Sequence, residues 1–329
     1  FGLKGTDEAE PKPPEETDET IKDKKVIPFG AVLLPLLNPG DNNFRKLRYI
    51  SIRSADITVG SVEQGVFFNA TEANLTFRRT QEGSIPADLN GEILYSQYHT
   101  PVTADLKFDQ QHIQANVNFD ELMPGTLAEL FSDDPHLKML NIPLSGRANI
   151  LMDEQGHLQT LGFSIDGGKG SINSVYLDSV MEVTKLHAEG QVGNNLKKIQ
   201  LDSFTATTGE SELSGSGMVL FNDQNQSSIR ANASITNVQA ANLHALWPPT
   251  LAPETRTWVI TNITAGHVPE AKATINIGFG DIDKPTLPKE AVDANIKLSD
   301  AEITYLPEHP QVKKISALVH IDGVALDAS

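Results

Sequence analysis

The chain has 329 residues, of which 26 are Lys or Arg and 43 are Asp or Glu, so its formal net charge is −17, and 39% of its residues are hydrophobic. The length allows two or three domain-sized units, and the apolar fraction is enough to bury a core, which argues against wholesale disorder. The negative charge disfavours nucleic acids and anionic membrane surfaces as partners, and the lack of Cys excludes disulfides, Cys-ligated metals and thiol catalysis.

Residues 1–40 are expected to form an acidic flexible linker and a connecting segment. Between Asp7 and Glu19, carboxylates are interspersed with prolines and apolar residues are almost absent. Burial could not offset the entropy lost if this stretch became ordered. An acidic interaction tail is the alternative interpretation.

The two ends of the chain suggest an internal piece of a longer protein. The chain starts with Phe1, and it ends within an alternating pattern at Ala325–Ser329. The longest apolar run, Val26–Leu37, is interrupted by two prolines and is shorter than the roughly 18 residues that a membrane span needs. We therefore expect any membrane anchor to lie elsewhere in the parent protein.

From Leu47 onward, apolar and polar residues alternate, which is typical of strands with one apolar and one polar face. Residues 104–108 and 113–119 flank a polar turn and predict a hairpin. The same pattern recurs over residues 73–77, 148–152, 273–279 and 294–298. Long helical patterns between these strands are lacking, so the sequence predicts an all-β fold. We expect an elongated antiparallel sheet, twisted and curled into an apolar-lined groove, with repeated modules and short helical insertions.

Two segments, Asp120–Phe131 and Val238–Ile263, space their apolar residues as short helices do. Each follows a predicted strand and precedes an apolar residue and a proline, at Ile142-Pro143 and Val268-Pro269, before the next strand. This correspondence indicates a weak internal repeat with a period of roughly 115–125 residues.

The repeat divides the chain into modules. We expect a first β-groove module over residues 41–150, with its helical insertion near 120–132. A second module is expected over residues 151–280, with its insertion near 238–263. Residues 281–329 would begin a third, truncated module.

The sequence contains no recognisable catalytic constellation. Its nine His residues lack metal-site spacing, and no Gly-x-Ser-x-Gly elbow is present. Asp166–Ser171 is superficially like a phosphate loop, but Gly170 separates Lys169 from the hydroxyl, so we interpret this stretch as a hairpin turn. Asp281 and its neighbours lie in a Gly-flanked turn, where Asp commonly bonds the backbone. We expect no enzymatic activity, no metal and no cofactor.

A motif between residues 246 and 268 has the order Trp-Pro, Arg-x-Trp and Asn-x-x-x-Gly. Its members are Trp247, Pro248, Arg256, Trp258, Asn262 and Gly266. The motif resembles that of the AsmA-like proteins, specifically the YhdP-type branch related to TamB. Supporting stretches are Ile142–Gly146, Ser214–Gly217, which we expect to close a strand, and the segment around Tyr305. The resemblance covers roughly residues 47–329.

The resemblance implies a periplasmic protein of Gram-negative bacteria, anchored in the inner membrane by an N-terminal helix. It implies a long β groove that carries phospholipid between the inner and outer membranes, and this chain would be one section of that groove. Phospholipid acyl chains are the implied partners, and other envelope proteins are further candidates.

The alternating residues themselves are compatible with an open trough that shelters acyl chains, since each buried methylene contributes about 0.8 kcal/mol. Transfer along such a trough requires no catalytic residue. The expected lining consists of Phe68, Leu75, Phe77, Leu106, Phe108, Ile113, Val117, Phe119, Ile275, Ile277, Phe279, Ile296 and Leu298.

Two other functions fit the residues. One is a closed, dry β scaffold or tether for envelope biogenesis, and the other is a periplasmic hydrolase or carbohydrate-binding module, which five Tyr and two Trp support poorly. We expect Trp247 and Trp258 to anchor the second helical insertion. Arg256 is expected to pair with a carboxylate or to cap a helix end, and contact with a lipid headgroup is the alternative.

Overall fold

The computed structural model describes most of the chain after residue 47. The described residues are 48–61, 66–80, 84–95, 97–108, 112–126, 138–153, 157–174, 177–193, 197–224, 226–249, 253–282, 284, 287–304, 309–322 and 325–328. Residues Leu47–Ser329 form one compact unit. The expected linker over residues 1–40 lies outside the described residues.

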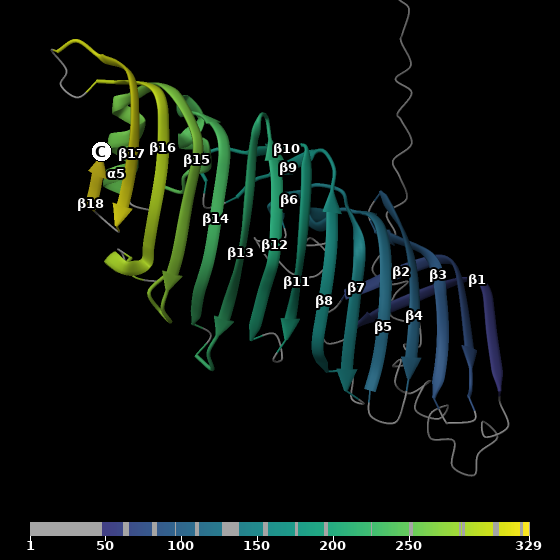
Figure 1. Cartoon of the computed structure of the whole chain (residues 1–329). Coiled ribbons are helices and arrows are strands. Elements are labelled where there is room, and N and C mark those ends of the chain that lie inside the picture. Colours follow the sequence, from purple (N-terminus) through teal and green to yellow (C-terminus); the bar gives the residue numbers. More distant parts are fainter. Residues whose placement is uncertain are drawn as a thin grey trace, which may run out of the picture. The chain divides into compact units, whose positions relative to one another are not determined.

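A single antiparallel sheet of 15 strands dominates this unit (Figure 1). Its neighbours follow chain order: β1 (Tyr49–Ser61), β2 (Val66–Arg78), β3 (Ile85–Tyr95), β4 (Tyr98–Phe108), β5 (His112–Leu122), β7 (Leu144–Asp153), β8 (Leu158–Gly167), β11 (Lys185–Gly193), β12 (Lys198–Thr208), β13 (Ser211–Phe221), β14 (Ser227–Gln239), β15 (Ile263–Ile277), β16 (Val292–Ile303), β17 (Val312–Asp322) and β18 (Ala325–Ala328). The sheet is twisted and does not close, because β1 and β18 are at opposite ends of the strand order. The predicted all-β fold is confirmed.

Two smaller groups of elements interrupt the meander. Strands β6 (Leu140–Asn141), β9 (Gly170–Ile172) and β10 (Met181–Val183) form a three-stranded sheet, which we call the small sheet. Between β14 and β15, the chain forms η2 (Ala240–Asn242), α4 (Leu243–Leu246) and α5 (Pro253–Asn262), which we call the helical insertion. A further turn, η3 (Lys289–Ala291), precedes β16. In the view of Figure 1, α5 lies behind β16 and β17.

Several strands contain a bulge at which one residue adopts a left-handed conformation. In β16, Asp300 has φ 51° and the register shifts between Leu298 and Ala301, both of which are buried. Strict alternation would place Leu298 and Ala301, which are three positions apart, on opposite faces of the sheet. The extra residue of the bulge returns Ala301 to the face of Leu298. Similar bulges accompany Ser54, Glu72, Glu121 and Lys314.

The predicted helical insertion near residues 238–263 is confirmed by η2, α4 and α5. The predicted insertion near residues 120–132 begins later than expected, because β5 continues through Leu122 and the helical residues that the structure describes are 124–126 and 138. Residues 127–137 lie outside the described residues.

Other boundaries also differ from the sequence predictions. The module boundary predicted after residue 150 falls inside β7, and the sheet runs through it and past residue 280 without a break in strand order. Ser214–Gly217 lies in the middle of β13 rather than closing a strand. The strand predicted to reach Phe279 ends at Ile277, because Asp281 accepts a bond from the Gly278 amide and turns the chain.

Candidate functional site

The strand registers arrange the apolar side chains in rows that cross the sheet. In row 1, the paired residues are Ile50, Phe77, Ala87, Leu106, Ala115, Ile150, Leu161, Val192, Ile199, Val219, Ile229 and Ile277. In row 2, they are Ile52, Leu75, Leu89, Ala104, Val117, Ala148, Phe163, Gly190, Leu201, Gly217, Ala231, Ile275 and Val292. Every member of these rows is apolar or Gly.

Two further rows lie on the same face. Row 3 consists of Gly91, Val102, Phe119, Gly146, Ile165, Ala188, Phe204, Gly215, Ala233, Ala273, Ala294 and Ile321. Row 4 consists of Leu122, Leu144, Gly167, Leu186, Ala206, Leu213, Ile235, Ala271, Ile296 and Val319. At about 4.8 Å between strands, row 1 extends for roughly 50 Å without a polar side chain.

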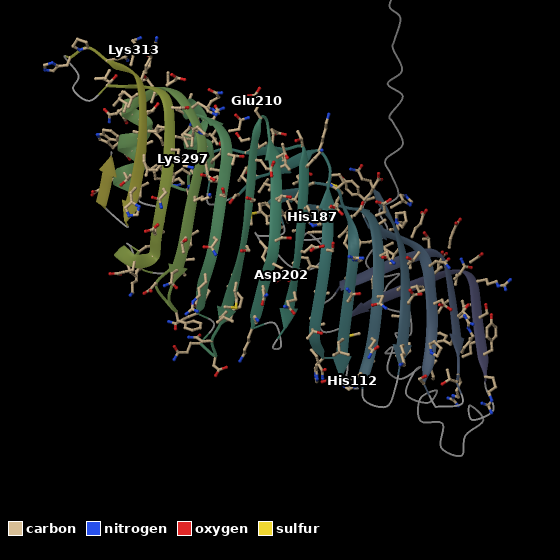
Figure 2. All side chains as sticks on the ribbon, viewed as in Figure 1. His112, His187, Asp202, Glu210, Lys297 and Lys313 are labelled. Carbon is tan, nitrogen blue, oxygen red and sulfur yellow. The ribbon has the colours of Figure 1, made fainter. Side chains whose placement is uncertain are left out.

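The opposite face of the sheet is polar. Neighbours of the row residues include Asp105, Asn116 and Asn149, which pair across β4, β5 and β7. Figure 2 marks His187, Asp202 and Lys297 from the same polar surface. The two faces therefore differ in chemistry along the described sheet, as the period-two pattern predicts.

Ion pairs on the polar face link neighbouring strands. Glu270 of β15 lies 2.6 Å from the Lys297 ammonium of β16 and 2.5 Å from that of Lys272. Hydrogen bonds from Lys272 and Lys297 lower the pKa of Glu270 to about 2. In the same way, Lys197 lowers the pKa of Asp223 and Lys284 lowers the pKa of Asp281. These carboxylates stay charged across the physiological range and act as links between surface segments.

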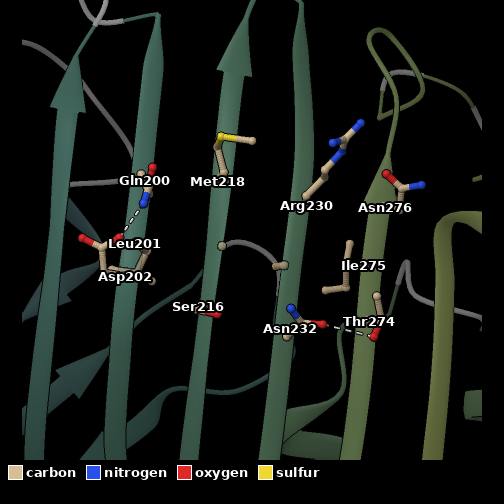
Figure 3. A pocket seen from close by; sticks show the side chains of 12 residues that line it. Gln200, Leu201, Asp202, Ser216, Met218, Arg230, Asn232, Thr274, Ile275 and Asn276 are labelled. Atoms are coloured by element: carbon tan, nitrogen blue, oxygen red, sulfur yellow. Dashed lines mark hydrogen bonds between the residues drawn. The ribbon is translucent and has the colours of Figure 1, made fainter.

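A hollow of about 700 Å³ lies on the polar face over β12 to β15. Figure 3 shows the side chains that line it, with a hydrogen bond of 2.5 Å from Gln200 to Asp202 and one of 3.2 Å from Thr274 to Asn232. These polar groups therefore bond to one another. The described part of the chain holds no group of three or more His, Asp or Glu residues arranged to bind a metal ion.

The small sheet covers rows 3 and 4 in the middle of the apolar face. Val183 of β10 is buried in a cluster with Leu144 and Leu186, and Ile172 and Met181 pack against the same cluster. Row 3 residues of β5, β8 and β12 also join it. Rows 3 and 4 are therefore sheltered from solvent where the small sheet lies on them.

The helical insertion covers the same two rows further along, over β14 to β17. Leu243, Trp247 and Val259 form a buried cluster with Ile296 and Val319 of row 4. Trp247 is 9% exposed, so its predicted role as an anchor is confirmed. The same prediction for Trp258 is wrong, because this side chain is 42% exposed on the outer side of α5.

Arg256 holds the helical insertion together. Its Nε donates to the Trp247 carbonyl at 2.8 Å, and an Nη2 hydrogen bond reaches the His244 carbonyl at 3.0 Å. These carbonyls lie at the C-terminal end of α4, where intrahelical donors are lacking and a cation is favoured. Nη2 also forms an ion pair with Asp178. Both predicted roles of Arg256, carboxylate pairing and helix capping, are confirmed.

The other motif residues make the return into β15. The Asn262 side chain donates to the Trp258 carbonyl at 2.8 Å at the end of α5. Gly266 has φ +129°, and a Cβ there would lie 2.7 Å from the Ala301 Cα of the adjacent strand. Only Gly fits this position. Pro248 follows Trp247 and lines the cavity described next, and Tyr305 lies outside the described residues.

Rows 1 and 2 stay accessible between β7 and β14. Most of their side chains there are half-buried, and Ile199 is 38% exposed. A cavity of about 610 Å³ opens over β12 to β17. Its walls are residues of all four rows on one side and Leu243, Leu246 and Trp247 of the helical insertion on the other. This cavity and the open parts of rows 1 and 2 form the candidate site, which we call the apolar track.

The sequence-predicted lining residues divide into three groups. Leu75, Leu106, Ile113, Val117, Phe119 and Ile275 are half-buried on the apolar face. Phe77, Phe108, Ile277, Ile296 and Leu298 lie on the same face but are buried, and the rings of Phe77 and Phe108 are 6.4 Å apart. Phe279 lies in the turn after β15 and is 47% exposed. Phe68 lies in β2, and its side chain is not among those that the structure describes.

Sequence reasoning missed the central part of the track. Its half-buried or exposed members there include Ile150, Leu161, Phe163, Val192, Ile199, Leu201, Val219 and Ile229. Their strands do alternate, but Gly and Ala occupy many of the intervening row positions and weaken the apolar signal. Gly190 shows why: a Cβ there would lie 2.3 Å from the Gln200 carbonyl oxygen and 2.8 Å from the ring of Phe163.

No helix in the described residues is long and apolar enough to cross a membrane. No protein-family model matches the chain, and neither the curated proteins nor the solved structures include a match. The site must therefore be interpreted from its own chemistry.

Proposed function

We propose that the apolar track binds the acyl chains of phospholipid and that lipid moves along it from strand to strand without chemical change. In this proposal the chain is an internal section of a periplasmic, YhdP-type protein of the AsmA-like group. The parent protein would be anchored in the inner membrane and would carry phospholipid between the inner and outer membranes of a Gram-negative bacterium.

The observation that carries the proposal is the unbroken composition of rows 1 and 2. Neither row contains a polar side chain from β1 to β15, and their central part is half-buried rather than sealed. Soluble monomers seldom expose continuous apolar surfaces of this kind unless the surface has a ligand or partner. An acyl chain is a ligand that needs only apolar contact.

The uniform composition of rows 1 and 2 is also compatible with movement of a bound acyl chain along them. Each methylene that leaves water gains about 0.8 kcal/mol wherever it contacts the track, because neighbouring positions offer similar aliphatic side chains. No charged group interrupts the rows and creates a deep local minimum. A bound chain can therefore shift by one strand spacing while it exchanges one set of weak contacts for an equivalent set.

The direct test is native mass spectrometry of the purified protein with lipid extraction, using charged substitutions on the track. Ile150 and Asn149 are neighbours in β7 that face opposite sides of the sheet, so Ile150→Glu places a carboxylate on the track and Asn149→Glu is the matched control. In β12, Leu201 and Thr205 are not neighbours, but they also face opposite sides of the sheet because a bulge lies between Leu201 and Phe204, so Leu201→Glu and Thr205→Glu form a second pair of track and control variants. Circular dichroism would first verify that each variant is folded.

We expect phospholipid to accompany the unmodified protein and both control variants, and to be lost from both track variants. Lipid retained by folded Ile150→Glu and Leu201→Glu would contradict the proposal. Protein that carries no lipid and takes none up from vesicles would favour the dry scaffold instead.

A further inference from the structure

The two covers of the apolar face are joined by a single described ion pair. Asp178 lies in the segment between β9 and β10 of the small sheet, and Arg256 lies in α5 of the helical insertion. The two residues are 78 positions apart in the sequence. This contact therefore connects two elements that otherwise pack on the sheet through separate apolar clusters.

The apolar cavity lies under the helical insertion and extends to sheet residues on which the small sheet packs. Phe204 and Leu213 line it and also pack against the cluster of the small sheet. Leu243 and Trp247 line it from the helical insertion. The link between the covers therefore joins an element that walls the cavity to one that packs beside it, on the side of rows 3 and 4.

The link can open without loss of either cover. Arg256 keeps its bonds to the His244 and Trp247 carbonyls when Asp178 leaves, and only 13% of its side chain is exposed. The Asp178 side chain, in contrast, is 52% exposed, so water can replace the guanidinium. The mobile partner in this pair is thus the carboxylate of the small sheet.

The neighbouring residue favours opening. The hydroxyl of Ser179 is buried and has no hydrogen-bond partner among the described residues. A buried hydroxyl without a partner costs free energy that hydration would recover. Movement of residues 177–180 away from the helical insertion would let water reach this group.

We propose that the Asp178–Arg256 pair is a latch that ties the helical insertion, which walls the cavity, to the small sheet beside it, and that it slows the exchange of lipid between the cavity and its surroundings. This inference rests on the proposed lipid-binding function. It adds a control point at which lipid enters or leaves the track from the side.

The test uses Asp178→Asn, which removes the charge and keeps the shape of the side chain. Asp88→Asn is a matched control, because Asp88 also pairs with an arginine, Arg78, at 3.0 Å and is 53% exposed, but on the polar face. Each protein would be loaded with phosphatidylethanolamine that carries a fluorescent acyl chain. Release into excess phosphatidylcholine vesicles and hydrogen exchange of residues 177–183 would then be measured.

We expect Asp178→Asn to release lipid about fivefold faster than the unmodified protein, which corresponds to a pair contribution of about 1 kcal/mol. Exchange over residues 177–183 should rise in parallel, and Asp88→Asn should leave both unchanged. Added salt should accelerate release from the unmodified protein but not from Asp178→Asn, because salt screens a half-exposed pair. A general loss of packing would not produce this salt dependence.

The outcomes separate the two proposals. Equal release from the unmodified protein and Asp178→Asn, with lipid bound to both, would overturn the latch and leave lipid binding in place. A failure of the unmodified protein to take up the fluorescent lipid would overturn the proposed function and the latch together.

Discussion

Arg256 is the residue whose removal should damage the helical insertion most specifically. Its bond to the Trp247 carbonyl is partly buried, and a hydrogen bond of this kind to a charged group contributes about 1.5–3 kcal/mol. The bond to the His244 carbonyl and the pair with Asp178 are more exposed, so each adds about 1 kcal/mol or less. We therefore expect Arg256→Ala to destabilise the insertion by about 3 kcal/mol.

The chain offers a convenient reporter for this measurement. It contains two Trp residues, and Trp258→Phe leaves Trp247, which is buried beneath the insertion, as the single fluorophore. Urea unfolding followed by Trp247 fluorescence would report the insertion, and far-UV circular dichroism would report the large sheet. We expect the fluorescence transition of Arg256→Ala to move to lower urea while the circular dichroism transition moves less.

Asp178→Asn provides the internal comparison, because it removes the ion pair and keeps both carbonyl bonds. Its loss should be below about 1 kcal/mol. A loss below about 1 kcal/mol in Arg256→Ala as well would refute the idea that Arg256 holds the end of α4. Equal losses in the two variants would show instead that the ion pair alone carries the effect.

Three other predictions concern packing and pH. Gly190→Ala should cost about 1–3 kcal/mol of folding free energy, because its Cβ would overlap the backbone of β12, and thermal unfolding would measure the loss. Trp247→Ala should cost about 3–5 kcal/mol in urea unfolding, whereas Trp258→Ala should cost less than about 1 kcal/mol because its side chain is half in solvent. Two lysines lower the pKa of Glu270 to about 2 from 4.5, so its stabilising effect is complete above about pH 4.5 and is lost as the pH falls through 2. Glu270→Gln should accordingly be less stable than the unmodified protein at pH 7, the difference should shrink as the pH falls from about 4.5 towards 2, and a constant difference in urea midpoints would contradict this.

Local patterns in the sequence were sufficient to predict an antiparallel sheet and to predict which residues lie on its apolar face and which on its polar face. The hairpin predicted over residues 104–119 exists, with Leu106 opposite Ala115, because alternating residues around a short polar turn specify their own register. The helical insertion was also predictable from apolar spacing between two strands. Where Gly replaces larger residues in a row, as at Gly215 and Gly217 of β13, the sequence resembles that of a turn, and the pattern therefore predicts a strand end where the strand continues.

Features that depend on distant segments were not predictable. The strands of the small sheet have two or three residues each, too few for a periodic pattern. The Asp178–Arg256 pair joins segments whose proximity is set by the whole sheet between them. The burial of Phe108, and the exposure of Trp258, likewise depend on what packs against each strand or helix rather than on the residue type.

The arrangement of the covers bears on the choice between a lipid track and a dry scaffold. A dry scaffold would gain most by sealing the whole apolar face, because each exposed aliphatic side chain forgoes burial free energy of about 1.5–3 kcal/mol. Here the small sheet and the helical insertion both pack over rows 3 and 4, and rows 1 and 2 stay half-buried through the middle strands. The described small sheet and helical insertion thus shelter rows 3 and 4 and leave rows 1 and 2 accessible along many strands. Accessible apolar rows would lower the stability of a scaffold without a ligand. A protein that admits acyl chains along its length requires such accessible rows.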